Sequence, residues 1–352
     1  MPRGRREAGF PAAQASFRPR EFHRATIRRR NPALSQSVAT APARARSSSS
    51  TGDAIFAFAA SSSGIFVLVL LGAIIVSLAV GALPAFRAFG IEFLWNSNWD
   101  PNLEIFGAAV PIYGTLLTSV VAIIIAVPIA FGIAFYLTEL APNWFRRPVG
   151  TAVELLAAVP SIIYGMWGLL VIAPFMAEYV QPSVIDLFDG IPVLEMLFQG
   201  PARGKGVFTA ALILAVMIIP FIAATMRDVF QTVPPVYKES AYGVGCTTWE
   251  VMRSIVIPYT RVSVVGGIML ALGRALGETM AVTFVIGNAN RISPNLFGSG
   301  ATIASLVALN FGEAKQGSLL LSSLLAIGFI LFVISFIVLA ISRMLLKPKA
   351  AK

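Results

Sequence analysis

Two ionisable residues interrupt a long apolar stretch in the last third of the chain. Arg274 and Glu278 are four residues apart within LGRALGETMAVTFVIGN, residues 272–288. If this stretch is one helix, the two side chains are neighbours on one face. Arg274 could offer its planar donor fork to an oxyanion, with Glu278 holding the fork or competing for it. Alternatively, the two form an ion pair that only offsets the cost of charge in an apolar helix.

Hydroxyls and small residues accompany this pair of charges. Thr279 and Thr283 could line a polar route, although Thr in a membrane helix often bonds to its own backbone. Gly273 and Gly277 have the spacing that lets a second helix approach closely. A helix of another subunit and a helix of the same chain both fit this spacing.

The composition indicates a membrane protein without a metal or cofactor site. The chain is 57% hydrophobic and 12% charged, and its mean hydropathy is +0.78, whereas soluble domains carry about 25% charged residues. Its one cysteine, Cys246, excludes a disulfide within the chain and a Cys-rich metal site. Its one histidine, His23, lies in a polar segment, which excludes a His-based zinc site or a Ser-His-Asp triad among the apolar stretches.

Six apolar stretches are each long enough for a helix that crosses a bilayer, which takes about 20 residues. We expect them at 64–86, 113–137, about 149–177, between 205 and 227, at 262–286, and between 315 and 343. The stretches are continuous rather than alternating, which favours helices over strands. The predicted fold class is all-α: a polytopic membrane helical bundle with six transmembrane helices.

The N-terminal segment differs from the rest in composition. Residues 1–53 hold eleven arginines and no apolar periodicity, which predicts a disordered basic tail. A basic arm on an anionic leaflet, an organellar transit peptide, and an extension without a function of its own all fit this composition. Residues 54–349 are the predicted transmembrane domain.

The orientation follows from the distribution of Lys and Arg between the connections. With the N-terminus inside, and the tail left aside, the inner connections hold ten Lys and Arg against five in the outer ones. Because positive residues favour the cytoplasmic side, both termini and the connection at about 227–261 are predicted to be cytoplasmic.

That inner connection contains KESAYGVGCTTWEVMRSIVIP, residues 238–258. The pattern predicts two short helices: Glu239 opens the first, Gly243 and Gly245 form the bend, and Thr247 begins the second. A structured, charged loop of this kind suggests a lever on which a partner outside the bilayer acts.

The loop resembles the consensus of ABC importer permeases: Glu-Ala-Ala, three residues, Gly, nine residues, Ile, one residue, Leu-Pro. The spacings agree, with conservative departures at Ser240 and Ile257; the matching residues are Glu239, Ser240, Ala241, Gly245, Ile255, Ile257 and Pro258. In that family the loop forms coupling helices that sit in a groove of a cytoplasmic ATPase. The resemblance implies the MetI-like permease fold and makes residues 227–261 the coupling loop.

Two further stretches, 272–288 and VMIIPFIAATMRDVFQTVP at 216–234, look like the PstC-type permease of phosphate importers. The resemblance covers about 60–349. It implies a bacterial inner-membrane subunit that works with a PstA-type permease, two copies of a PstB-type ATPase and a PstS-type phosphate-binding protein. It also implies that Arg274 and Glu278 lie on the phosphate path, and we assign Thr279 and Thr283 to the same path.

The chain has no Walker A loop, so we expect a transport subunit rather than an ATP-hydrolysing enzyme. Three alternatives stay open from the residues alone. They are a permease for another oxyanion such as sulfate or molybdate, a membrane enzyme that uses Arg274 and Glu278 catalytically, and a passive anion channel.

Overall fold

The computed structural model describes residues 51–345, and within them the regular elements are helices. The structure divides into two units after Ile65. The first described element, α1 (Thr51–Phe89), contributes its first residues to the first unit and the remainder to the second. Most of the predicted N-terminal tail lies outside the described residues, but Thr51–Asp53 form the first turn of α1.

Six segments are long and apolar enough to cross a membrane, as predicted. They are Thr51–Leu94, Ala109–Leu140, Ser161–Phe188, Val207–Gln231, Thr248–Leu276 and Leu319–Met344. Several of them combine an α-helix with 3-10 or π-helical turns. In chain order these six contain α1 and η2 (Gly90–Leu94); α2 (Ala109–Phe135) and η3 (Tyr136–Leu140); α4 (Ser161–Trp167), η4 (Gly168–Ile172), α5 (Ala173–Phe175), η5 (Met176–Val180) and α6 (Gln181–Phe188); α8 (Val207–Gln231); α10 (Thr248–Val251), η6 (Met252–Val256) and α11 (Ile257–Leu276); and α14 (Leu319–Leu345).

The remaining helices are shorter and connect these spans. They are α3 (Asn143–Ala157), α7 (Pro192–Phe198), α9 (Pro235–Gly243), α12 (Met280–Val285) and α13 (Ile303–Asn310).

The predicted limits of the third span, 149–177, are wrong. Residues 143–157 form the separate helix α3, and the span begins at Ser161, directly after Pro160. Proline disfavours a helical conformation in the residue before it, so Pro160 separates two helices instead of bending one. Glu154 therefore lies on α3 and not in the span. Pro174 does lie inside the span, between the π-helical turns η4 and η5.

The predicted limits of the fifth span, 262–286, are also wrong. The helical segment starts at Thr248 and continues through Arg253 and Arg261, then ends at Leu276. Gly277 is the C-cap of α11, and α12 begins only at Met280. Glycine favours helix ends because it has a high conformational entropy to lose in a helix. The prediction began the span after Arg261 because it excluded Arg253 and Arg261 from the helix. Both belong to it, since charged side chains are tolerated near the ends of a membrane helix.

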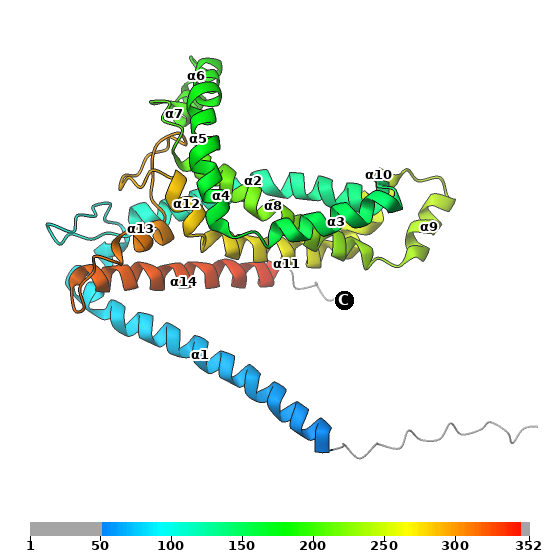
Figure 1. Cartoon of the computed structure of the whole chain (residues 1–352), viewed down its shortest axis with the longest axis horizontal. Coiled ribbons are helices and arrows are strands. Elements are labelled where there is room, and N and C mark those ends of the chain that lie inside the picture. The colour runs from blue at the N-terminus through cyan, green and yellow to red at the C-terminus, as the bar shows by residue number, and fades with distance from the viewer. Residues whose placement is uncertain (1–50, 346–352) are drawn as a thin grey trace, which may run out of the picture. The chain divides into compact units, whose positions relative to one another are not determined.

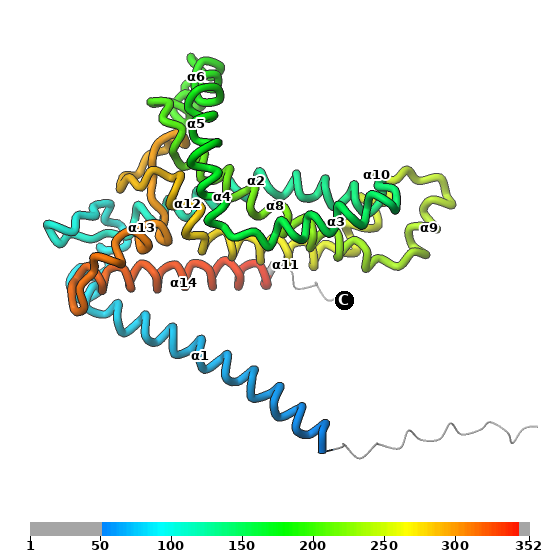
Figure 2. Tube along the Cα trace, viewed as in Figure 1, coloured from blue at the N-terminus to red at the C-terminus, as the bar shows by residue number. Residues whose placement is uncertain are grey.

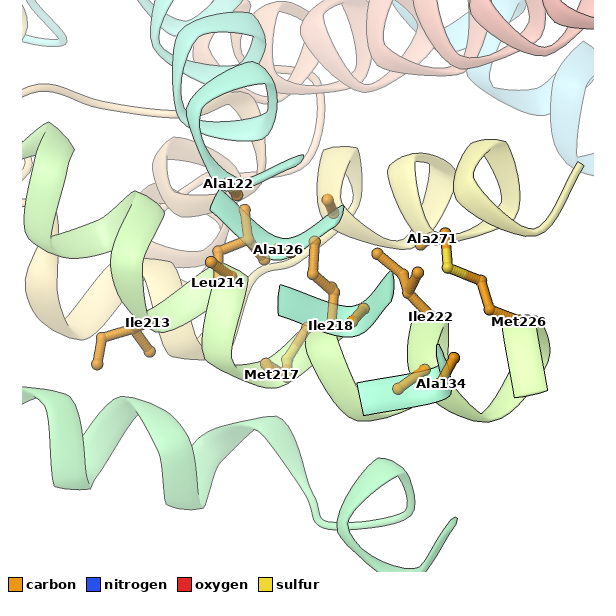
Figure 3. Packing of buried hydrophobic residues seen from close by; sticks show 14 of the residues in the cluster. Ala122, Ala126, Ala134, Ile213, Leu214, Met217, Ile218, Ile222, Met226 and Ala271 are labelled. Carbon is orange, nitrogen blue, oxygen red and sulfur yellow. The ribbon is translucent and has the colours of Figure 1, made fainter. Parts of the chain in front are cut away.

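Small residues bring the central helices together. Ala122, Ala126, Ala130 and Ala134 are spaced four apart on α2 and are fully buried, so they form one smooth face. Large residues of α8 pack in the same cluster, including Ile213, Leu214, Met217, Ile218 and Ile222 (Figure 3). The α2–α8 pair is thus the centre of the bundle.

The arrangement separates a loop end from the opposite end of the bundle. α2, α8, α11 and α14 run side by side, whereas α4 to α6 cross them at a steep angle (Figure 1). α9 and α10 lie together at one end of these helices, as the tube in Figure 2 also shows. The break between α11 and α12 lies away from that end, beside α4.

Candidate functional site

Arg274 lies in the last turn of α11, and its residue is exposed. Within residues 51–345 its guanidinium makes no ion pair and no hydrogen bond with the protein. Tyr164 on α4 lies close enough to interact electrostatically with this charge. Five N–H donors of one side chain are therefore available to a group from outside this chain.

Glu278 lies in the break between α11 and α12. Its Oε1 accepts a hydrogen bond of 3.2 Å from the backbone N–H of Ala281, so the carboxylate stabilises the start of α12. The prediction that Arg274 and Glu278 share one helix face is wrong, because the helix ends at Leu276. In the described part of the chain the two side chains form no ion pair with each other.

The threonine hydroxyls use their protons within the chain. Thr279 Oγ1 donates to the carbonyl of Gly277 at 3.3 Å, and Thr283 Oγ1 donates to the carbonyl of Thr279 at 2.6 Å. A hydroxyl has one proton to donate, so each of these can offer a ligand only acceptor lone pairs. Both side chains are half-buried beside the break. An oxyanion here would depend on Arg274 for donors.

The glycines of α11 face two different environments. A Cβ added at Gly273 would meet no atom within 4 Å, and one at Gly277 would meet only backbone oxygens of its own turn, the nearest at 3.8 Å. A Cβ at Gly267 would instead lie 2.7 Å from Thr225 Cγ2 on α8. Within this chain, α11 therefore packs closely through Gly267, and the face that carries Gly273 is open.

The predicted first helix and bend of the coupling loop are present, but the predicted second short helix, α10, is the first turn of the continuous helical segment Thr248–Leu276. α9 ends at Gly243, Gly245 takes a positive φ of +93°, and Thr247 begins α10. Thr247 Oγ1 accepts from the backbone N–H of Glu250, while the Glu250 carboxylate accepts from the backbone N–H of Thr247 at 2.7 Å. This reciprocal capping box fixes the start of α10.

The other residues of the loop motif separate into inward and outward groups. Ala241 is buried and Ile255 is half-buried against the core, whereas Glu239, Ser240 and Pro258 are exposed. Large apolar side chains also lie on the outer surface of the loop: Val236, Tyr237, Tyr242, Val244 and Trp249. Exposed apolar groups gathered in this way are typical of an interaction site.

Two ion-paired groups were not predicted as functional residues. Lys238 Nζ lies 2.6 Å from Glu139 Oε1 at the end of the second span. Arg227 on α8 bonds Asp228 at 2.8 Å and also Glu154 on α3. Glu139, Glu154 and Arg227 were visible in the sequence as single charges at the ends of predicted spans, and Lys238 as a charge in the inner connection, but sequence spacing does not tell which of these charges form pairs.

A comparison with known protein families assigns the chain to a family. Residues 126–348 match the family described as "Binding-protein-dependent transport system inner membrane component". The chain belongs to this family. It is a membrane transport component, as predicted, and the ATPase of such a system is a separate subunit.

Curated relatives agree with that family assignment. The chain is 60% identical over 284 residues to the Mesorhizobium japonicum "Phosphate transport system permease protein PstC", a match that covers 81% of the chain and 86% of the relative. The protein of the same name from Pasteurella multocida is 59% identical, with 80% and 88% covered.

The solved structures share the fold at low sequence identity. A bacterial alginate ABC transporter in complex with a pentasaccharide-bound periplasmic protein matches with a TM-score of 0.53 at 16% identity, over 83% of this chain and 93% of that one. The inward-facing MetNI methionine ABC transporter matches with a TM-score of 0.50 at 16% identity, over 70% and 99%. The predicted ABC importer permease fold is confirmed.

Proposed function

We propose that this permease forms part of the path for inorganic phosphate in an ATP-driven importer. Support comes from relatives of up to 60% identity whose names specify phosphate transport. In this proposal the chain works with a PstA-type permease, two copies of a PstB-type ATPase and a PstS-type binding protein in a bacterial inner membrane.

The observation that carries the proposed path is the free guanidinium of Arg274. An ionisable group in a membrane span costs about 2.5–3.5 kcal/mol on the lenient insertion scale, and such groups usually mark transport pathways. Arg274 lies beside a helix break and within electrostatic range of Tyr164, and no described residue of the chain neutralises it. A phosphate oxyanion is a chemical partner that its donor fork fits.

The roles of the neighbouring residues follow from their contacts. Glu278 stabilises the start of α12 and so holds the break open beside Arg274. Thr279 and Thr283 present acceptor oxygens, which can bind the protonated oxygen of a hydrogenphosphate. Together these four residues provide both kinds of hydrogen-bonding partner for a partly protonated anion.

The coupling loop is proposed to dock on the ATPase at the cytoplasmic face, with both termini on the same side. Its exposed apolar residues, such as Tyr237 and Trp249, supply the contact surface, and the excess of Lys and Arg in the inner connections supports the orientation. ATP-driven closure of the ATPase pair would then shift the packing of the helices between two states. The open face at Gly273 is proposed to receive a helix of the sister permease.

The proposal is tested by reconstituting the complete complex in proteoliposomes with the binding protein. We expect uptake of radiolabelled phosphate that requires ATP and proceeds against a gradient, with little competition from excess sulfate or molybdate. Uptake without ATP would indicate a passive channel. Equal competition by sulfate or molybdate would show that the path serves oxyanions in general.

A further inference from the structure

A partly buried ion pair connects the coupling loop to a membrane span that is distant in sequence. Lys238 on α9 and Glu139 at the end of the second span are 99 positions apart, and their Nζ and Oε1 atoms lie 2.6 Å apart. Only 18% of the lysine side chain and 9% of the glutamate side chain are exposed. Charged side chains are seldom buried unless they are paired, so each of these depends on the other.

α9 presents this lysine on its inner face. Lys238 and Ala241 are three residues apart, which places them on one side of the helix, and Ala241 is buried in the core. The opposite side of the helix carries exposed residues, among them Val236, Glu239 and Ser240. A partner can therefore press on the outer face of α9 while the inner face remains attached to Glu139.

Glu139 is itself fixed to the centre of the bundle. It belongs to the π-helical turn η3, which continues directly from α2. Arg146 reinforces this end of the span by donating from Nη2 to the carbonyl of Thr138 at 2.7 Å. Because α2 packs along α8 through its row of alanines, a displacement of Glu139 would move the helix at the core of the bundle.

We propose that the Glu139–Lys238 pair transmits motion of the coupling loop to α2. The inference rests on the proposed function, in which the loop docks on an ATPase. The covalent chain connects the loop to α8 on one side and to α11 on the other. The ion pair adds a third connection, to α2, so that all three central helices respond to one movement of α9. Glu139 and Lys238 are positioning residues, since neither touches the transported anion.

The test uses the complete complex in proteoliposomes and measures phosphate transported per ATP hydrolysed. Glu139→Gln and Lys238→Met each remove one charge. We expect both variants to keep the ATPase bound and active, while transport per ATP falls about twofold to thirtyfold, the range of energetic coupling through side-chain networks. The double variant Glu139→Lys/Lys238→Glu restores an ion pair of reversed polarity and is expected to recover most of the ratio.

Glu154→Gln is the matched control. It makes the same chemical change in another ion pair, and Arg227 keeps Asp228 as a partner at 2.8 Å. The transport ratio should stay at the wild-type value. A similar fall in this control would overturn the proposal, because the effect would then be general to ion pairs in this permease.

The other outcomes also decide the matter. Wild-type ratios in both single variants would reject the pair as a transmission contact. If the single variants do not assemble, the charge-reversed variant decides: recovery of assembly and ratio supports the proposal, and failure to recover overturns it. Absence of ATP-dependent phosphate uptake by the wild-type complex would reject the proposed function instead.

Discussion

The coupling loop and the helix break at Arg274 differ in whether their charged side chains have partners within the chain. In the loop, Lys238 is paired with Glu139, and Glu250 caps the helix that begins after Thr247. At the break, Arg274 has no protein partner among the described residues. In the proposed function, the loop must keep its shape while the ATPase moves it, and its polar groups are satisfied internally. The proposed anion site instead keeps a charge available, at a cost in the stability of the isolated subunit.

Loss of the Arg274 charge is expected to have the largest effect. Arg274→Ala should reduce phosphate uptake by the reconstituted complex on the order of 100-fold, because truncating one partner of the charge pair formed with the bound anion typically costs about 2–5 kcal/mol once that pair is enclosed. Arg274→Lys keeps the charge but not the planar fork, and should give an intermediate rate. Normal uptake by the alanine variant in an intact complex would remove Arg274 from the path.

The bend of the coupling loop comes next. Gly245 has a φ of +93°, a conformation that strains a β-branched residue by about 1–3 kcal/mol. Gly245→Val should therefore distort the loop and uncouple ATP hydrolysis from phosphate uptake. The amount of phosphate transported per ATP hydrolysed, measured in proteoliposomes, should fall by about tenfold.

Gly243→Val is the control for the bend. Gly243 lies two residues away, has no positive φ and has open space where a Cβ would be placed. Its valine variant should couple normally. Equal uncoupling by both variants would show that bulk on the loop surface, and not the shape of the bend, is what the partner senses.

The same two regions show how far the sequence predicts this structure. The loop was predicted in form because its signals are local: Gly245 requires a bend, and Thr247 with Glu250 specifies a helix start. The six spans were predicted in number because each depends on apolar length alone. Both depend on properties of adjacent residues, which a sequence displays directly.

The break at Gly277 and the pairing of Glu139 could not be predicted in this way. Gly277, Glu278 and Thr279 interrupt the apolar stretch over only three residues, and apolar residues resume at Met280, so the stretch was taken as one helix and Arg274 and Glu278 were wrongly placed on one face. The partner of Lys238 lies 99 positions away and is selected by packing of α9 against the bundle. Tertiary contacts, not spacing, determine both features.

A smaller effect separates the two glycine environments of α11. Gly267→Leu should destabilise the isolated permease by about 1–3 kcal/mol, since the new side chain would collide with Thr225. Gly273→Leu should change its stability by less than about 0.5 kcal/mol, because the added atoms enter open space. The measurement is thermal unfolding of the purified subunit in detergent.

In the assembled complex, Gly273→Leu should have the larger effect of the two glycine variants, whereas Gly267→Leu has the larger effect on the isolated subunit. If the face at Gly273 receives the sister permease, Gly273→Leu should weaken co-purification of that subunit although the isolated chain is stable. Undiminished co-purification would leave that face to lipid and assign the partner to another surface.

The smallest effect is expected at the cap of α10. Thr247→Ala removes the hydroxyl that accepts from the backbone N–H of Glu250, and loss of such a cap costs about 1 kcal/mol. Because α10 is the first turn of the helical segment Thr248–Leu276, the loss should appear as local fraying, with faster amide exchange over Thr248–Val251, and coupling should be reduced less than by Gly245→Val. Thr248→Ala changes the adjacent residue, which is not the cap, and should leave exchange in α10 nearly unchanged. If the amides of α10 exchange equally fast in the two alanine variants, the cap at Thr247 does not stabilise the loop. The contrast between a loop with internally satisfied polar groups and an Arg274 that is unpaired among the described residues would then be wrong for the loop.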